Sequence, residues 1–147
     1  MSSESNGRLR FTHIRLENWR NFSRAEVALQ ARVFLVGPNA SGKSNLLDAF
    51  RFLRDLVSVG GGFQEAVRRR GGVSALRCLA ARRYPDVVVH VAIGTDSEPK
   101  RWEYTLSIRQ DNQRRQARLS LSQERQESHP RRLRHVPSGR RRPAHRL

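Results

Sequence analysis

The sequence contains few of the residues that cross-link a chain or anchor it in a lipid bilayer. Its one cysteine, Cys78, excludes an intrachain disulfide bond. It has no run of about 18 apolar residues, so we expect no membrane-spanning helix. Residues Met1 to Gly7 lack the apolar core of a secretion signal. We therefore expect a cytoplasmic protein that has no membrane partner.

Acidic and apolar residues are also scarce. Asp and Glu number 13 against 29 Lys and Arg, which gives a formal net charge of +16, and Lys43 and Lys100 are the only lysines. Such a charge attracts polyanions, including nucleic acids and nucleotides, but it does not determine a fold. Apolar residues make up 37% of the chain, below the roughly 45–50% of an average soluble domain. Residues 114–147 hold eleven arginines and two glutamates, so this end differs in character from the rest.

Residues 9–110 carry the patterns of regular secondary structure, and residues 1–8 are expected to be a disordered lead-in. Alternation around Ile14 and around Val27 predicts half-buried strands, and the apolar run Val33–Val36 predicts a strand buried on both faces. Apolar residues at three- and four-residue steps predict a helix from about Gly42 to Ser58. Shorter helices are expected at 63–70 and 73–83, and a hairpin is expected from strands at 87–93 and 102–108.

The periodicity fades after Asp111. Residues 131–147 are rich in arginine, proline and histidine and offer almost nothing to bury, so we expect them to be disordered in isolation. We therefore divide the chain into the lead-in, an ordered region at 9–110 and an Arg-rich, low-order tail at 111–147. The abrupt loss of pattern raises the hypothesis that the tail is out-of-frame or degenerate sequence, which the downstream reading frame of the source DNA would test.

A complete phosphate-binding-loop pattern, Gly-x4-Gly-Lys-Ser, occupies Gly37, Pro38, Asn39, Ala40, Ser41, Gly42, Lys43 and Ser44. Glycines let the backbone fold tightly around an anion and present successive N–H groups to it. The helix that begins near Gly42 adds its positive end. Lys43 is placed to contact the β- and γ-phosphates, and the Ser44 hydroxyl to bind Mg²⁺. The alternative, an ordinary glycine turn with an exposed lysine, is disfavoured because an apolar strand pattern precedes the loop and a long amphipathic helix pattern follows it.

The run from Ile14 to Phe22, followed by Gly37 to Asn45, resembles the opening of the ABC-type ATPases of the SMC/RecF class, especially the AAA-labelled, RecF-like ATPases of bacteria. The resemblance implies an α/β or α+β fold, with a mixed sheet around the phosphate-loop strand, and ATP held between two ATPase heads that form a homodimer. It places Asn39 and Asn45 among the nucleotide-binding residues. It also makes Arg20 a candidate phosphate contact, although a solvated turn residue is an equal alternative.

Hydrolysis in that family needs further elements, including an acidic metal-binding strand, a glutamine loop, a signature sequence and a switch histidine. The apolar run from Val87 to Ile93 is better explained by the hairpin than by the acidic strand, and Leu119 to Gln123 matches the signature only superficially. No feature selects a loop glutamine among Gln110, Gln113 and Gln116, and His129, His135 and His145 lack metal-ligand spacing. We therefore predict an N-terminal ATPase lobe that binds ATP and hydrolyses it only when another segment or chain completes the site. The alternatives are a protein that binds DNA or RNA non-specifically through its Arg-rich tail, and a non-functional truncation product.

Overall fold

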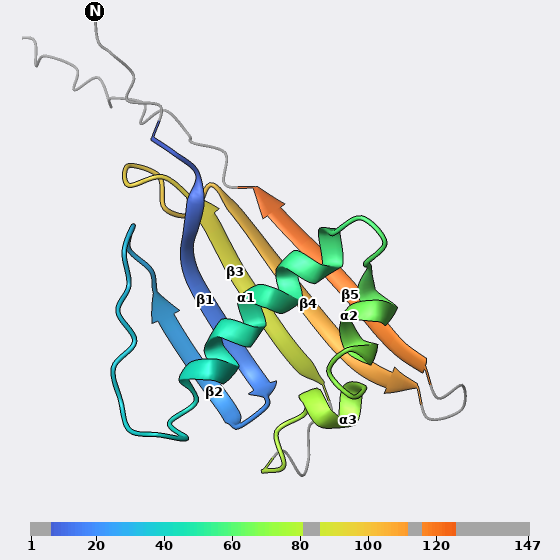
Figure 1. The fold of residues 1–147 in the computed structure, drawn as a ribbon. Coiled ribbons are helices and arrows are strands. Elements are labelled where there is room, and N and C mark those ends of the chain that lie inside the picture. Colours follow the sequence, from blue (N-terminus) through green and yellow to red (C-terminus); the bar gives the residue numbers. More distant parts are fainter. Residues whose placement is uncertain (1–6, 81–85, 112–115, 126–147) are drawn as a thin grey trace, which may run out of the picture.

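A computed structural model describes residues 7–80, 86–111 and 116–125. Five strands and three helices occur in these ranges (Figure 1): β1 Arg10–Trp19, β2 Phe22–Ala28, α1 Lys43–Val57, α2 Phe63–Arg68, α3 Val73–Leu76, β3 Val87–Gly94, β4 Trp102–Asp111 and β5 Gln116–Arg125. Within these ranges, no helix has both the length and the apolar character needed to cross a membrane.

The strands form one sheet in the order β2-β1-β3-β4-β5, and every neighbouring pair is antiparallel. The helices lie over one face of this sheet, with α1 crossing it diagonally (Figure 1). Alternation along β1 explains this two-layer arrangement, since Ile14 and Leu16 are buried beneath the helices while His13 and Arg15 lie on the opposite, polar face. The predicted α/β or α+β class is therefore confirmed.

The core lies between α1 and the central strands. Trp19, at the end of β1, packs against Phe52 of α1 with ring centroids 5.4 Å apart, and both side chains are fully buried. The indole Nε1–H of Trp19 donates a 2.9 Å hydrogen bond to the carbonyl oxygen of Asn45 in the first turns of α1. This contact ties the start of α1, and with it the preceding loop, to the turn between β1 and β2.

A buried arginine joins α1 to the segment after α2. The Arg70 guanidinium lies 3.1 Å from Asp48 and 2.9 Å from Asp55, which are two turns apart on α1. It also donates to the carbonyl oxygen of Ala66 at 2.8 Å and lies over the ring of Phe52, 5.2 Å from its centroid. The side chain of Arg70 is only 7% exposed, so its charge depends on these partners.

The predicted strand at Val33–Val36 is wrong. These residues run outside the sheet, which is antiparallel throughout rather than mixed, and the side chains of Phe34 and Val36 are 86% and 94% exposed. An apolar run forms a strand only where a neighbouring strand pairs with its backbone, and no strand among the described residues lies beside this one. The run is apolar, as the sequence shows, but whether its backbone pairs with another strand depends on the tertiary structure.

The hairpin is confirmed, since β3 and β4 pair from Val87 with Ile108 to Ile93 with Trp102. The predicted helices at 42–58 and 63–70 correspond to α1 and α2. The third predicted helix is too long, because α3 ends at Leu76 and the next residues pair with the end of β1. There, Arg77 forms a bridge with Trp19, and the Cys78 amide donates to the carbonyl oxygen of Asn18 at 2.8 Å. Residues 81–85 of the predicted helix lie outside the described ranges.

The boundary drawn after Asp111 also needs correction. Residues 116–125, assigned to the low-order tail, form β5 and pair with β4 along its whole length. The side chains of Ala117 and Leu119 pack against the core on the helix side. The other side of β5 carries arginine, serine and glutamate, and this polar character concealed the strand in the sequence. Residues 1–6, 112–115 and 126–147 lie outside the described ranges.

Candidate functional site

The backbone of the loop at Gly37 to Ser44 curves sharply before α1 begins. Gly42 has φ 97°, in the left-handed region that favours glycine, and a Cβ atom there would lie 2.6 Å from the ring of Phe22. Ala40 adopts φ 64°, which is uncommon for a residue with a side chain. Glycine at position 42 is thus required both by the backbone conformation and by the space that β2 leaves.

The N-terminus of α1 opens directly onto this loop. Gly42 is its N-cap and provides no side-chain hydrogen bond, and the first turn contains no acidic residue. The first N–H groups of a helix have no partner within the helix, and the dipole of a 15-residue helix makes this end positive. The arrangement favours an anion at this end of α1.

Lys43 folds back across the loop. Its Nζ donates hydrogen bonds to the carbonyl oxygens of Gly37 at 2.7 Å and Pro38 at 2.6 Å, and it lies 3.4 Å from the Ser41 hydroxyl. The positive charge is therefore held within the curve of the loop, beside the N–H groups of α1. Carbonyl oxygens are weaker partners for an ammonium group than phosphate oxygens, because charge-assisted bonds between two ions are stronger.

A cavity of about 380 Å³ lies at the loop and is lined by Asn21, Asn39, Ala40, Ser41, Gly42, Lys43, Ser44 and Asn45. Seven of these residues are the predicted nucleotide-binding residues from Asn39 to Asn45. The other two loop residues, Gly37 and Pro38, line an adjoining cavity of about 330 Å³ between the loop and β2, which Ser41, Gly42 and Lys43 also line. The structure thus brings most of the predicted site to one cavity and adds Asn21 to it.

Asn21 joins the loop cavity to a second one. The side-chain amide of Asn45 donates a 2.7 Å hydrogen bond to Asn21 Oδ1, and both residues also line a neighbouring cavity of about 560 Å³. Its other lining residues are Arg20, Ser74, Ala75, Arg77, Cys78, Leu79 and Ala80. Sequence reasoning gave no role to residues 74–80, since only tertiary packing brings them beside the turn at Asn21.

Arg20 does not line the loop cavity. Its guanidinium pairs with Asp48 of α1 at 3.0 Å and donates to the carbonyl oxygen of Ala75 at 3.3 Å. Its backbone is left-handed, with φ 53°, and its amide donates to the carbonyl oxygen of Leu76 at 2.7 Å. In this structure Arg20 connects the turn after β1 to α1 and α3 through these contacts, and it also lines the second cavity.

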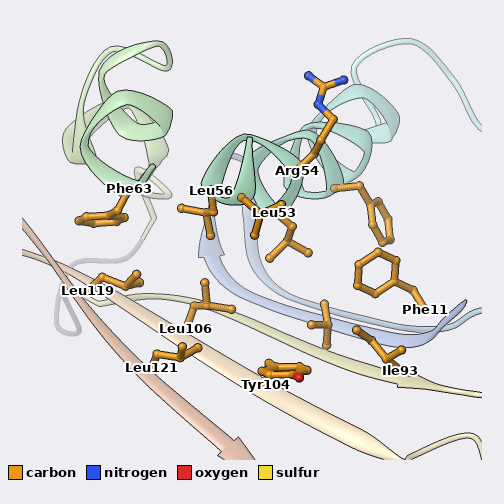
Figure 2. A pocket seen from close by; sticks show the side chains of 13 residues that line it. Phe11, Leu53, Arg54, Leu56, Phe63, Ile93, Tyr104, Leu106, Leu119 and Leu121 are labelled. Atoms are coloured by element: carbon orange, nitrogen blue, oxygen red, sulfur yellow. The ribbon is translucent and has the colours of Figure 1, made fainter. Parts of the chain in front are cut away.

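An apolar cavity lies away from the loop. Figure 2 shows side chains of α1, α2 and the sheet around a space of about 640 Å³, among them Phe63, Tyr104 and Leu119. Among the described residues that line it, Arg54 alone carries a charge. A phosphate needs hydrogen-bond donors and positive charge, so this apolar groove does not suit the polyphosphate part of a nucleotide.

Mg²⁺ requires oxygen ligands in octahedral geometry and commonly takes some of them from substrate phosphates and water. The residues described here contain no group of three or more His, Cys, Asp or Glu side chains that could hold a metal ion. The Ser44 hydroxyl, at the cavity, fits the role of a single protein ligand to a phosphate-bound magnesium ion.

The chain is similar to two curated proteins described as "DNA replication and repair protein RecF", from Clavibacter michiganensis subsp. michiganensis (strain NCPPB 382) and from Clavibacter sepedonicus. Each is 37% identical over 83 residues, which cover 55% of this chain and 20% of the relative. The chain thus spans about a fifth of the length of these relatives. A solved structure of the recombination mediator protein RecF with ATP shares the fold, with a TM-score of 0.50 at 21% identity over 87% of this chain and 30% of that one.

The sequence profile of one family matches residues 32–146, which is most of the chain and includes the phosphate-binding loop. This agrees with the RecF-like resemblance of the sequence. The chain belongs to the family of P-loop ATPases described as "AAA domain, putative AbiEii toxin, Type IV TA system".

Proposed function

We propose that this chain is the ATP-binding lobe of a RecF-like ATPase and binds ATP with Mg²⁺ at the loop from Gly37 to Ser44. One observation carries the proposal: the Lys43 ammonium and the open N-terminus of α1 converge on the same cavity. A lysine and unpaired helix N–H groups on one concave surface are the groups that a polyphosphate needs.

On binding, the phosphates take the place of the loop carbonyls as partners of Lys43. The N–H groups at the start of α1 would donate to the phosphate oxygens, and the Ser44 hydroxyl would serve as a ligand to a phosphate-bound Mg²⁺. Asn39 and Asn45, which line the same cavity, contribute side-chain amides that donate hydrogen bonds. Bound Mg²⁺ neutralises phosphate charge, and the residues of the loop orient the phosphates for that contact.

We further assign the nucleoside part of ATP to the second cavity, because Asn21 and Asn45 form a wall common to both cavities. Arg77 borders this space and has a buried Nε–H that finds no acceptor within the described residues. Arg20 could reach a phosphate only by leaving Asp48, so we assign it to the positioning of α1.

For turnover, the lobe needs a group that activates water. Asp48 lies four residues after Ser44 on α1, yet both Arg20 and Arg70 pair with it. These two guanidinium groups occupy the carboxylate, and Asp48 is not among the residues that line the loop cavity. We therefore propose that the activating carboxylate comes from residues other than those described, or from another chain.

ATP binding to the full chain tests the proposal directly. Equilibrium binding of labelled ATP is measured for wild type, for Lys43→Ala and for Lys100→Ala. The last variant is a matched control, because it removes the only other lysine, which lies on the far hairpin and is 52% exposed. We expect Lys43→Ala to abolish measurable binding and Lys100→Ala to leave it intact. Equal ATP binding by wild type and Lys43→Ala would contradict the proposal.

Nucleic-acid binding is a second candidate function, favoured by the concentration of charge at one end. Residues 126–147 contain seven arginines and one glutamate, and arginines that contact phosphates give affinity that is independent of sequence and falls steeply with salt. Because β5 ends at Arg125, the informative deletion removes residues 126–147 and spares the sheet. We expect DNA affinity to fall in the deletion variant; unchanged affinity would exclude this mechanism.

A further inference from the structure

Arg77 lies at the second cavity because the segment after α3 is held against the end of β1. Its amide donates to the carbonyl oxygen of Val73 at 3.0 Å, and its backbone forms a bridge with Trp19 (Figure 1). These contacts fix the backbone at position 77. The side chain lines the cavity of about 560 Å³ that Asn21 and Asn45 join to the loop cavity.

The guanidinium group of Arg77 has no acceptor among the residues that the structure describes. Its Nε–H is buried without a partner, and within these residues the side chain forms neither a hydrogen bond nor an ion pair. Its charge acts on the Asp86 carboxylate, but that group receives its hydrogen bonds from Arg109 and Ser107. A guanidinium group presents several N–H donors and no acceptor. A half-buried donor without an acceptor is unfavourable, so a ligand that offers acceptors would stabilise this side chain.

Arg20, the other arginine at this cavity, is already engaged. It too has a buried Nε–H without an acceptor. Its terminal nitrogens, however, bond to Asp48 at 3.0 Å and to the carbonyl oxygen of Ala75 at 3.3 Å. Of the two arginines, Arg77 is therefore the one whose terminal N–H groups are available to a ligand.

The lining of the cavity indicates how a nucleobase is recognised there. Its volume of about 560 Å³ lies within the usual range for small-molecule sites. None of the described residues that line it is aromatic, so recognition depends on hydrogen bonds to the edge of the base rather than on stacking between rings. Both purines present N7 as an acceptor; guanine adds the acceptor O6, whereas adenine adds an amino donor at N6. A guanidinium group therefore matches both groups of guanine and one of adenine.

We propose that Arg77 recognises the purine base of the bound nucleotide at its N7 edge, so that the lobe takes GTP at least as well as ATP. Pyrimidine nucleotides lack N7 and bind more weakly. This inference rests on the proposed function, in which the loop holds the triphosphate and the second cavity holds the nucleoside. It deepens that function by naming the substrate class, purine nucleoside triphosphates.

Equilibrium binding to the full chain tests the inference with ATP, GTP, CTP and tripolyphosphate, each in the presence of Mg²⁺. Tripolyphosphate has no base and therefore reports on the loop alone. For wild type we expect GTP to bind at least as tightly as ATP. We expect CTP to bind roughly tenfold more weakly than either purine nucleotide, which corresponds to the loss of one good base contact.

Arg77→Gln is the informative variant, because a glutamine amide pairs with both N6 and N7 of adenine. We expect the ratio of GTP affinity to ATP affinity to fall roughly tenfold in this variant. The ratio cancels the effect of the lost charge, since ATP and GTP carry the same triphosphate, and retained tripolyphosphate binding verifies that the variant is folded. Arg51→Gln is the matched control. It removes the same charge at an exposed position of α1 that lines neither cavity, and its ratio should equal that of wild type.

A ratio that shifts in Arg77→Gln but not in Arg51→Gln supports the inference. It is overturned if Arg77→Gln keeps the wild-type ratio, if wild type binds GTP more than about tenfold more weakly than ATP, or if CTP binds as tightly as ATP. In those cases, binding of ATP and tripolyphosphate that depends on Lys43 would still support the proposed function. If wild type binds neither tripolyphosphate nor any nucleotide, the proposed function fails and this inference fails with it.

Discussion

Replacing Arg70 by alanine removes the group that joins α1 to the segment after α2. The variant loses ion pairs to Asp48 and Asp55, a hydrogen bond to the carbonyl oxygen of Ala66 and the cation–π contact with Phe52. Both aspartates are mostly buried, since their side chains are 20% and 10% exposed. The variant therefore leaves two mostly buried carboxylates without the Arg70 charge. This lowers the unfolding free energy more than the loss of a surface ion pair does.

The expected destabilisation is about 3 kcal/mol, the lower end of the roughly 3–5 kcal/mol measured when one partner of a buried ion pair is removed. The lower end applies because each aspartate keeps a second arginine: Arg20 for Asp48 and Arg54 for Asp55. Hydrogen bonding from Arg54 and then from Arg70 lowers the pKa of Asp55 below its usual range. Some of that stabilisation of the charged form thus survives without Arg70.

Urea unfolding followed by tryptophan fluorescence measures this loss, because Trp19 is buried against Phe52 and becomes exposed on unfolding. Arg51→Ala is the matched control, since Arg51 lies on the exposed side of the same helix, and such a change is expected to stay within about 0.5 kcal/mol of wild type. A loss below about 1 kcal/mol for Arg70→Ala, or equal losses for both variants, would refute the reasoning.

Two further predictions concern the loop and the effect of pH. Gly42→Ala should lower the unfolding free energy and also weaken ATP binding, because alanine there combines an unfavourable φ with a clash against the ring of Phe22. Gly60→Ala is the control, since Gly60 also has a positive φ, 70°, but open space around it. This variant should lower only the unfolding free energy. ATP binding that is reduced equally in both variants would contradict the role of the Phe22 contact. The bidentate hydrogen bond from Arg109, at 2.7 and 2.8 Å, lowers the pKa of the Asp86 carboxyl. Its stabilising effect is present above the unfolded pKa of about 3.9 and is lost as pH falls through the lower folded value. Unfolding free energy measured between neutral pH and pH about 2 should therefore fall less steeply in Arg109→Gln than in wild type, and identical profiles would show that the pair contributes nothing.

The sequence alone identified the elements that depend on local signals. The glycine spacing and Lys43 located the loop, and the three- and four-residue periodicity located α1. An apolar run, followed after a Gly-, Ser- and Pro-containing turn by an alternating segment, located the hairpin of β3 and β4. In each case the residues of the segment itself form the recognisable pattern. Contacts with residues far away in the sequence were therefore not needed to predict it.

Other features depend on partners that a sequence pattern does not name. The apolar run Val33–Val36 has strand composition, but whether it pairs depends on a neighbouring strand, and among the described residues it has none. The opposite holds for β5. Its sequence is polar on one face and did not predict a strand, yet β4 stabilises it by pairing along its full length. Backbone hydrogen bonds between strands are non-local, so the same local pattern is compatible with a strand or with an extended segment.

The candidate site shows the same division. Residues Asn39 to Asn45 reach the cavity because they are consecutive, and the tight turn at Gly42 fixes their arrangement. The sequence did not predict the direction of the Arg20 side chain, because a long, flexible arginine side chain turns toward the acceptors that the tertiary structure provides. Asp48 and the Ala75 carbonyl oxygen, supplied by α1 and α3, draw it away from the loop. Sequence therefore determined which residues line the loop cavity, whereas the tertiary structure decided that the nearby Arg20 side chain pairs with α1 and α3 instead of lining it.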